Sequence, residues 1–203
     1  MTYLTACRLI ACSLITFVAM TTVYSSEMEQ QETPWTVTEL MRSMAQVRHS
    51  KATFVERKHF SMLKEPLVFA GQLLYTAPGR LEKYTSVPKP ESMVLDQDKL
   101  TMQSGDNGKP RVVSLREYPA IWAFVESIRS TLAGDFETLN RFYKVSMEGN
   151  DKKWRLILLP LDSKMKSLVD EIRITGSNEQ INTIEVMEAG GDHSMMEITR
   201  DDS

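Results

Sequence analysis

The chain has 203 residues, 42% of them hydrophobic and 25% charged, with a formal net charge of −3 at pH 7. That length suits one domain with a substantial core. The negative balance, and Lys and Arg residues that are scattered rather than gathered in a stripe, argue against nucleic acid as a partner.

The first 25 residues have the pattern of a secretory signal peptide. Arg8 supplies a short basic start, and residues 9–20 form a mostly apolar core that is too short to span a bilayer comfortably. Residues 23–25 are acceptable before a cleavage site. We predict cleavage near Ser25, export of the chain, and one domain over residues 26–203.

Both cysteines lie in that leader. Cys7 and Cys12 would leave with it, so the mature chain is expected to have neither a disulfide nor thiolate chemistry. Residues 9–12 look like a lipobox. A lipobox follows the apolar core, however, and here the core continues from Leu14 to Met20, which argues against lipidation.

A helix is predicted over residues 36–48. Thr36-Val37-Thr38-Glu39 fits a capping box, and apolar residues recur behind it at helical spacing. From residue 53 onward the pattern changes to period two. It predicts strands near 53–60, 68–76, 80–85, 91–96, 99–104 and 111–115.

The turns between these strands are polar and tight. Ala77-Pro78-Gly79, Asp96-Gln97-Asp98 and Gly105-Asp106-Asn107-Gly108 are typical of hairpin connections. Pro119 then suits a first helical position, and an apolar face follows until Gly134 ends the helix. We expect a second short helix over 135–142 and strands near 144–148, 153–160, 168–175, 181–188 and 193–199.

Consecutive strands joined by short turns pair antiparallel. The fold class is therefore mainly β with helices (α+β): one meandering antiparallel sheet of about ten to eleven strands, which has to curl. The strand over 68–76 carries apolar residues at both odd and even positions, including Phe69, Leu73 and Tyr75 on one side and Val68 and Leu74 on the other. This indicates a surface that wraps an apolar partner.

No enzyme hypothesis has a supporting residue cluster. The three histidines, His49, His59 and His193, are far apart in the sequence, so neither a metal site nor a cofactor is expected. Three S-x-x-K matches, at residues 61–64, 86–89 and 163–166, lack the S-D-N and K-T-G elements of penicillin-recognising enzymes. Of the 13 methionines, those of the mature chain are either core filler or an adaptable binding surface.

Several local sequences follow one another in a recognisable order along the chain. They are Ala52-Thr53-Phe54-Val55-Glu56, Gly71-Gln72-Leu73-Leu74-Tyr75, Pro78-Gly79-Arg80-Leu81, Pro90-Glu91-Ser92, the Asp96 turn before Leu100, Trp154-Arg155-Leu156-Ile157-Leu158-Leu159-Pro160, and end strands with Ile172, Ile174, Ile184 and Val186. In this shared order they resemble the LolA family of periplasmic outer-membrane lipoprotein carriers, and the resemblance covers most of the mature chain.

The resemblance implies an incomplete β-barrel whose concave apolar face is covered by a helical lid and holds the acyl chains of a lipoprotein. It implies a monomeric periplasmic carrier without catalytic residues, which receives cargo from an inner-membrane loading complex and delivers it to an outer-membrane acceptor. We expect a cavity lined by Leu73, Tyr75, Leu81, Tyr84, Leu156, Leu158, Ile172 and Ile174, under a lid with Trp122, Phe124, Val125 and Ile128.

One position departs from the family pattern. Family members have an arginine directly before the Pro of the first hairpin turn, where it helps to latch the lid, and this chain has Ala77. Arg80 is a candidate substitute. Because the same fold serves other roles, a periplasmic lipid-binding accessory or sensor protein with a non-protein acyl ligand stays open as an alternative, with a hydrolase more distant.

Overall fold

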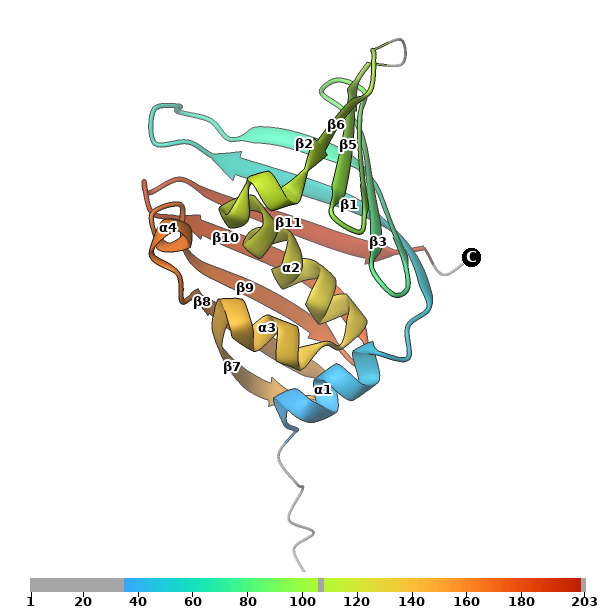
Figure 1. Ribbon diagram of the computed structural model, residues 1–203, viewed down its shortest axis with the longest axis vertical. Coiled ribbons are helices and arrows are strands. Elements are labelled where there is room, and N and C mark those ends of the chain that lie inside the picture. The colour runs from blue at the N-terminus through green and yellow to red at the C-terminus, as the bar shows by residue number, and fades with distance from the viewer. Residues whose placement is uncertain (1–34, 106–107, 202–203) are drawn as a thin grey trace, which may run out of the picture. The chain divides into compact units, whose positions relative to one another are not determined.

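A computed structural model describes residues 35–105 and 108–201 of the protein. The predicted signal peptide and the centre of the Gly105–Gly108 turn lie outside the described residues. The described chain forms one antiparallel sheet of 11 strands with helices on one face (Figure 1). The strands are β1 (His49–His59), β2 (Leu67–Thr76), β3 (Arg80–Val87), β4 (Glu91–Asp96), β5 (Lys99–Ser104), β6 (Arg111–Ser114), β7 (Tyr143–Asn150), β8 (Lys153–Pro160), β9 (Val169–Ser177), β10 (Gln180–Glu188) and β11 (His193–Arg200).

The sheet consists of two meanders joined by the first and last strands. Its strand order is β6-β5-β4-β3-β2-β1-β11-β10-β9-β8-β7, so β6 and β7 are the two edges and the sheet is not closed. The joint runs from Ala52 opposite Arg200 to His59 opposite His193. The expected antiparallel open sheet is thereby confirmed. The pairing of β1 with β11 was not predicted, because it joins segments that are remote in sequence.

The helices are α1 (Val37–Met44), α2 (Pro119–Ala133), α3 (Phe136–Phe142) and the single turn α4 (Ser163–Lys166), with a 3-10 turn η1 (Leu115–Glu117). The capping box at Thr36 is present: its side chain accepts a hydrogen bond from the Glu39 backbone at 3.3 Å, and the Glu39 carboxylate accepts one from the Thr36 N–H at 2.7 Å. The predicted helix over 36–48 is too long. The helix ends at Met44, and β1 begins at His49. The prediction extended the helix because the helical spacing of apolar residues continues into the turn between α1 and β1.

The end of α2 is determined by a close approach of two helices. Gly134 follows the helix with φ 69°, in the left-handed region that favours glycine. A Cβ at this position would lie 2.1 Å from the carbonyl oxygen of Met41 in α1. Gly134 therefore ends α2 and lets the chain turn beside α1 into α3.

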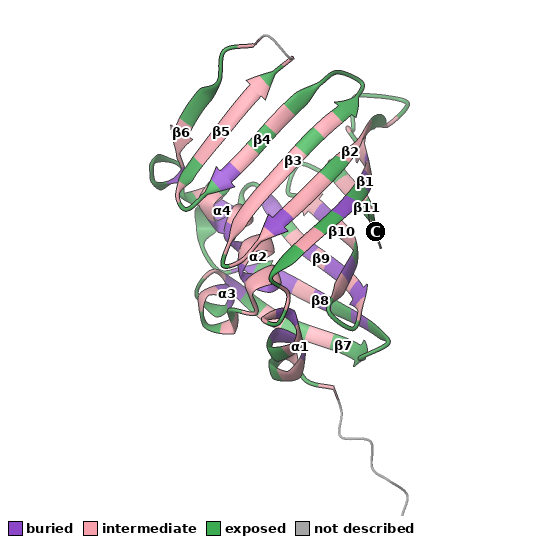
Figure 2. Cartoon of the chain, turned by 90° about the vertical axis from the view of Figure 1, so that its right-hand side faces the viewer, coloured by how far each residue is buried: buried purple, intermediate pink, exposed green. Residues whose placement is uncertain are grey.

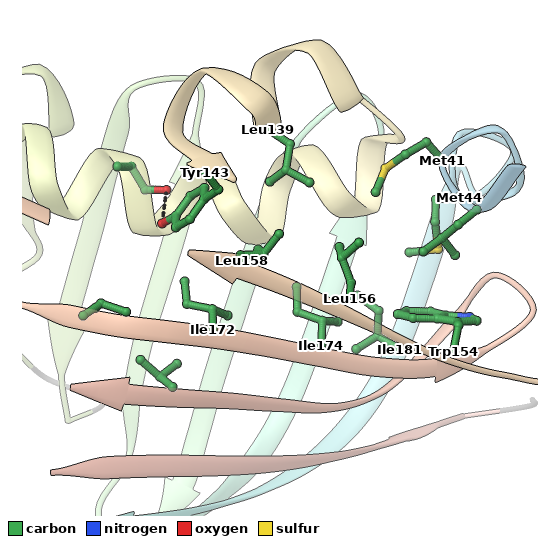
Figure 3. Packing of buried hydrophobic residues seen from close by; sticks show 14 of the residues in the cluster. Met41, Met44, Leu139, Tyr143, Trp154, Leu156, Leu158, Ile172, Ile174 and Ile181 are labelled. Carbon is green, nitrogen blue, oxygen red and sulfur yellow. Dashed lines mark hydrogen bonds between the residues drawn. The ribbon is translucent and has the colours of Figure 1, made fainter. Parts of the chain in front are cut away.

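The two meanders differ in how tightly they are packed. Along β8, and along β9 from Ile172 onward, every second residue is buried, whereas Leu95 is the one buried residue of β4 and β5 and their other residues are half-buried or exposed (Figure 2). The hydrophobic core lies where α1, α2 and α3 meet β7 to β10. Its largest members, many of them labelled in Figure 3, include Leu40, Met44, Leu139, Tyr143, Trp154, Leu156, Leu158, Ile172 and Ile174.

Candidate ligand-binding cavity

An apolar cavity of about 630 Å³ lies between α2 and the inner face of the sheet. Pockets that bind small molecules are typically in the range of roughly 300–1,000 Å³ and are mostly apolar. Strands from both meanders supply the wall, chiefly from β1 to β5, β10 and β11. The cavity therefore covers the part of the sheet where α1 and α3 do not fill the space.

The strand register explains which side chains line the wall. Directly paired residues on adjacent antiparallel strands point to the same face of a sheet. One row across five strands comprises Ser50, Tyr75, Leu81, Leu95 and Leu100, and the next comprises Arg200, Ala52, Leu73, Lys83 and Met93. All ten residues line the cavity. The odd-numbered side of β2 is thus the inner side.

The roof of the cavity is one face of α2. Phe124, Val125 and Ile128 line the cavity, together with Ile121 and Leu132. They follow the spacing of three to four residues that places side chains on one helical face. The helix presents different faces to the cavity, to the core and to the turns of the β2–β3 and β4–β5 hairpins.

The residues expected at the cavity fall into three groups. Leu73, Tyr75 and Leu81 of the sheet and Phe124, Val125 and Ile128 of α2 do line it. Leu156, Leu158, Ile172 and Ile174 are on the inner face but are fully buried in the core. Tyr84 and Trp122 point elsewhere, as described next.

Tyr84 and Trp122 do not line the cavity, and each donates a hydrogen bond to a carboxylate. Tyr84, which is 41% exposed, donates from its hydroxyl to Glu82 at 2.6 Å. Trp122 donates from Nε1 to the Glu126 carboxylate at 2.7 Å and borders a groove beside the hairpin turns. Periodicity placed Trp122 on a broad apolar stripe, but it could not show that α2 has neighbours on several sides.

Sequence reasoning missed the lining residues of β4, β5, β10 and β11. Their period-two pattern was visible, but the face of each strand depends on its pairing. Met93, Leu95, Leu100, Ile184, Val186, Met196 and Ile198 belong to this group.

Three of the charged side chains in the mostly apolar wall, Glu56, Lys58 and Lys83, form one group. Lys83 Nζ lies 2.5 Å from Glu56 Oε2, and Lys58 Nζ lies 3.4 Å from Glu56 Oε1. The Glu56 side chain is 8% exposed, compared with 24% for Lys83 and 40% for Lys58. The Lys83 ammonium also lies over the Phe54 ring, 4.7 Å from its centroid. A carboxylate this deeply buried requires such partners.

A second polar group in the wall is the Tyr75 hydroxyl. Tyr75 is 4% exposed, and among the residues that the structure describes its hydroxyl has no hydrogen-bond partner. Burial, opposed only by the nearby Arg48, raises the pKa of Tyr75. The hydroxyl therefore remains protonated and able to donate a hydrogen bond in the cavity wall.

Within the described ranges, no three His, Cys, Asp or Glu side chains are placed to hold a metal ion. Nor is any helix of the described chain long and apolar enough to cross a bilayer. What the geometry provides is an apolar chamber with a few polar groups, which suits the binding of an apolar molecule.

A family model described as outer membrane lipoprotein carrier protein LolA-like matches residues 32–198. No curated protein sequence matched the chain.

Solved structures with a similar arrangement include a LolA superfamily protein from Nitrosomonas europaea, with 11% identity, a TM-score of 0.43 and coverage of 81% of this chain and 91% of that one. A DUF1329 family protein from Desulfovibrio piger has 10% identity, a TM-score of 0.44 and coverage of 82% and 92%. The MucA/MucB complex of Pseudomonas aeruginosa gives 10% identity, a TM-score of 0.46 and coverage of 80% and 55%. Because the family model spans most of the chain, this protein belongs to the LolA-like family of outer membrane lipoprotein carrier proteins.

Proposed function

We propose that this protein is a periplasmic carrier that holds the acyl chains of a lipoprotein in the cavity beneath α2 and moves it from the inner towards the outer membrane. The observation that carries the proposal is the apolar chamber between α2 and an open sheet. The cargo and the direction are those that the family description implies. A loading complex at the inner membrane and an acceptor at the outer one would be its partners.

The energetics suit a carrier that needs no covalent chemistry. Burial of apolar surface gains about 0.8 kcal/mol per methylene, so a sixteen-carbon chain gains on the order of 12 kcal/mol. A bilayer offers the chain nearly the same gain. The balance between loading and release then depends on small changes in the cavity, such as a shift of α2.

In this proposal the cargo contacts both the wall and the roof. Leu73, Tyr75 and Leu81 supply the wall, and Phe124, Val125 and Ile128 supply the roof. Leu156, Leu158, Ile172 and Ile174 support the site from the core beside it. They would reach the cargo only if α1 and α3 moved.

A second candidate function is a lipid-binding accessory or sensor protein whose acyl ligand is not part of a protein. The observation that favours it is the group formed by Glu56, Lys58 and Lys83. Charged side chains in the wall contribute nothing to the binding of an acyl chain alone, whereas they can bind the charged headgroup of a lipid.

A charge in the roof tests the carrier proposal. Val125 lines the cavity without being fully buried in the core, so Val125→Asp should leave the fold intact and abolish retention of an acylated molecule. The measurement is native mass spectrometry of protein released gently from the periplasm. The matched control is Leu159→Asp, because Leu159 of β8 is 38% exposed and lies outside the cavity.

The expected result is retained cargo in the wild type and in Leu159→Asp, and its loss in Val125→Asp. Circular dichroism would verify that all three proteins are folded. Retention of cargo by a folded Val125→Asp protein would show that α2 is not the roof of the binding site.

A further inference from the structure

The charged side chains in the cavity wall form a group with an excess of positive charge. Glu56 is the one carboxylate between Lys58 and Lys83, and it contacts both of them. One negative charge cannot neutralise two ammonium groups. The group therefore has an unused capacity to bind a second anion.

A role in joining strands alone would not explain the contact between Glu56 and Lys83, because it costs desolvation free energy. Glu56 lies in β1 and Lys83 in β3, so their contact crosses β2 at Gly71, which pairs with Phe54 and carries no side chain. Placing charges in a mostly apolar wall costs desolvation free energy, and an apolar pair of similar volume would avoid that cost. A role in recognition accounts for the presence of these charges.

The exposure of the three side chains gives the site a direction. Along the inner side of β1, Ala52 is followed by Phe54, Glu56 and Lys58, and Lys58 is the most exposed of the three charged residues. Lys58 pairs with Ser194 of β11, which also lines the cavity. We take this partly exposed, polar end at Lys58 and Ser194 as the mouth of the cavity, with apolar side chains such as Leu73, Leu81 and Leu95 further along the sheet.

Other charged residues at the cavity do not cancel this excess locally. Glu82 is paired with Arg80 at 2.9 Å, and Glu179 and Glu188 are exposed, where solvent screens them. Arg200 adds a further positive charge to the wall. The half-buried Lys83 and Lys58 remain the cations best placed to meet an anion that enters at the mouth.

We infer that the cavity takes single amphiphiles with an anionic headgroup, with the head between Lys58 and Lys83 and the acyl tail in the apolar part beneath α2. This inference rests on the second candidate function, a lipid-binding protein whose acyl ligand is not part of a protein, and specifies the class of that ligand. Glu56 keeps the two ammonium groups in place, and each can donate a charge-assisted hydrogen bond to a carboxylate or phosphate oxygen. Both headgroups share this chemistry.

Displacement of a bound fluorescent probe tests the inference. Purified full-length mature protein is loaded with the uncharged probe N-phenyl-1-naphthylamine and titrated with dodecanoate, dodecyl phosphate and the uncharged methyl dodecanoate. We expect both anions to displace the probe at lower concentration than the ester does. The two anions distinguish a fatty acid from a phosphate-bearing lipid as the preferred source of the headgroup.

The variants then assign the preference to the lysines. Lys58→Gln combined with Lys83→Gln should weaken the binding of the anions by about tenfold to a hundredfold, as expected for lost charge-assisted hydrogen bonds. The affinity for the ester should not change. Lys51→Gln is the matched control: Lys51 is also in β1 but on the other face, where it pairs with Asp201 at 3.4 Å.

Each other outcome has a distinct meaning. The inference would be overturned if the wild type bound the anions and the ester with equal affinity, or if the double variant lost the same affinity for the ester as for the anions. Acyl binding itself would still stand. Failure of all three ligands to displace the probe would count against the acyl-binding function itself. If the double variant does not fold, Lys58→Gln alone decides, because Lys58 is the more exposed lysine and its loss leaves the Glu56–Lys83 pair intact.

Discussion

Arg129 of α2 donates a hydrogen bond from Nη1 to the backbone carbonyl oxygen of Gln97, at 2.9 Å. Gln97 is in the turn between β4 and β5, so this bond ties the roof of the cavity to the sheet. The Arg129 side chain also lies against Gly79, where a Cβ would be 2.7 Å from its Cδ. Glu126, buried one helical turn earlier, accepts hydrogen bonds from the same guanidinium.

This connection has the opposite direction to the latch that the LolA resemblance implies. There the arginine is on the hairpin and reaches the helices, and here Ala77 occupies that position. Arg80 engages acids of the sheet, Glu82 at 2.9 Å and Asp96 at 3.0 Å. The arginine that joins helix to hairpin in this chain is on the helix.

Removing this tie should loosen α2. In the double variant Glu126→Gln and Arg129→Met the helix loses its bond to Gln97 without leaving a buried carboxylate unpaired. We expect faster amide hydrogen exchange across α2 and a free energy of unfolding lower by about 1–3 kcal/mol. Arg141→Met is the control, since Arg141 of α3 is exposed and its pairing with Glu137 is worth little. Unchanged exchange in α2 would mean that other contacts, such as the 3.0 Å bond from Tyr143 to Ala123, suffice to hold it.

Tyr75 and Tyr84 are expected to respond differently to the loss of their hydroxyls. The Tyr75 hydroxyl is buried and unpaired within the described chain, so Tyr75→Phe removes a desolvation cost and should leave the free energy of unfolding unchanged or raise it by up to about 1 kcal/mol. Tyr84→Phe loses the 2.6 Å bond to Glu82 at the surface and should lower stability by about 0.5 kcal/mol. Urea titration at neutral pH measures both. A clear destabilisation by Tyr75→Phe would show that its hydroxyl has a partner in solution.

The cap of α1 should make stability depend on pH in the acidic range. Hydrogen bonds from the backbone N–H and side-chain hydroxyl of Thr36 lower the pKa of Glu39. A carboxyl group with a lowered pKa stabilises the fold above its ordinary value of about 4.3, and this contribution is lost as the pH falls through the lower folded-state pKa.

Glu39→Gln should therefore reduce the stability at pH 7 and have a smaller effect near pH 3, where the wild-type carboxyl is protonated to a greater extent than at pH 7. Thermal unfolding at the two pH values measures the difference. Glu137→Gln, an exposed change in α3, serves as the control. If Glu39→Gln lowered the stability by the same amount at both pH values, this would contradict the role assigned to the Glu39 carboxylate.

Local patterns determined the elements of the fold. The period-two segments, the Asp96-Gln97-Asp98 turn, Pro119 and Gly134 act within a few residues, and the structure has strands, a hairpin and a helix where they predict them. The limits of this reasoning appear at α1, where helical spacing runs across a turn into β1. They appear again at α4, which Asp162 caps with bonds to the Lys164 and Met165 backbone and which was not predicted.

The division of the inner face between core and cavity was decided only by the tertiary structure. Leu73 and Leu156 look alike in sequence, as apolar residues of β-strands, yet Leu156 is covered by the helices packed on β8 whereas Leu73 borders the open space under α2. The tertiary structure also brings Glu56 of β1 into contact with Lys83 of β3. In the same way it brings Arg129 of α2 to Gln97 in the turn between β4 and β5. A sequence specifies how apolar and polar residues alternate within each segment, because that depends only on neighbours in the chain. It does not reveal which segments cover one another, because that depends on long-range pairing and on how much space the helices leave.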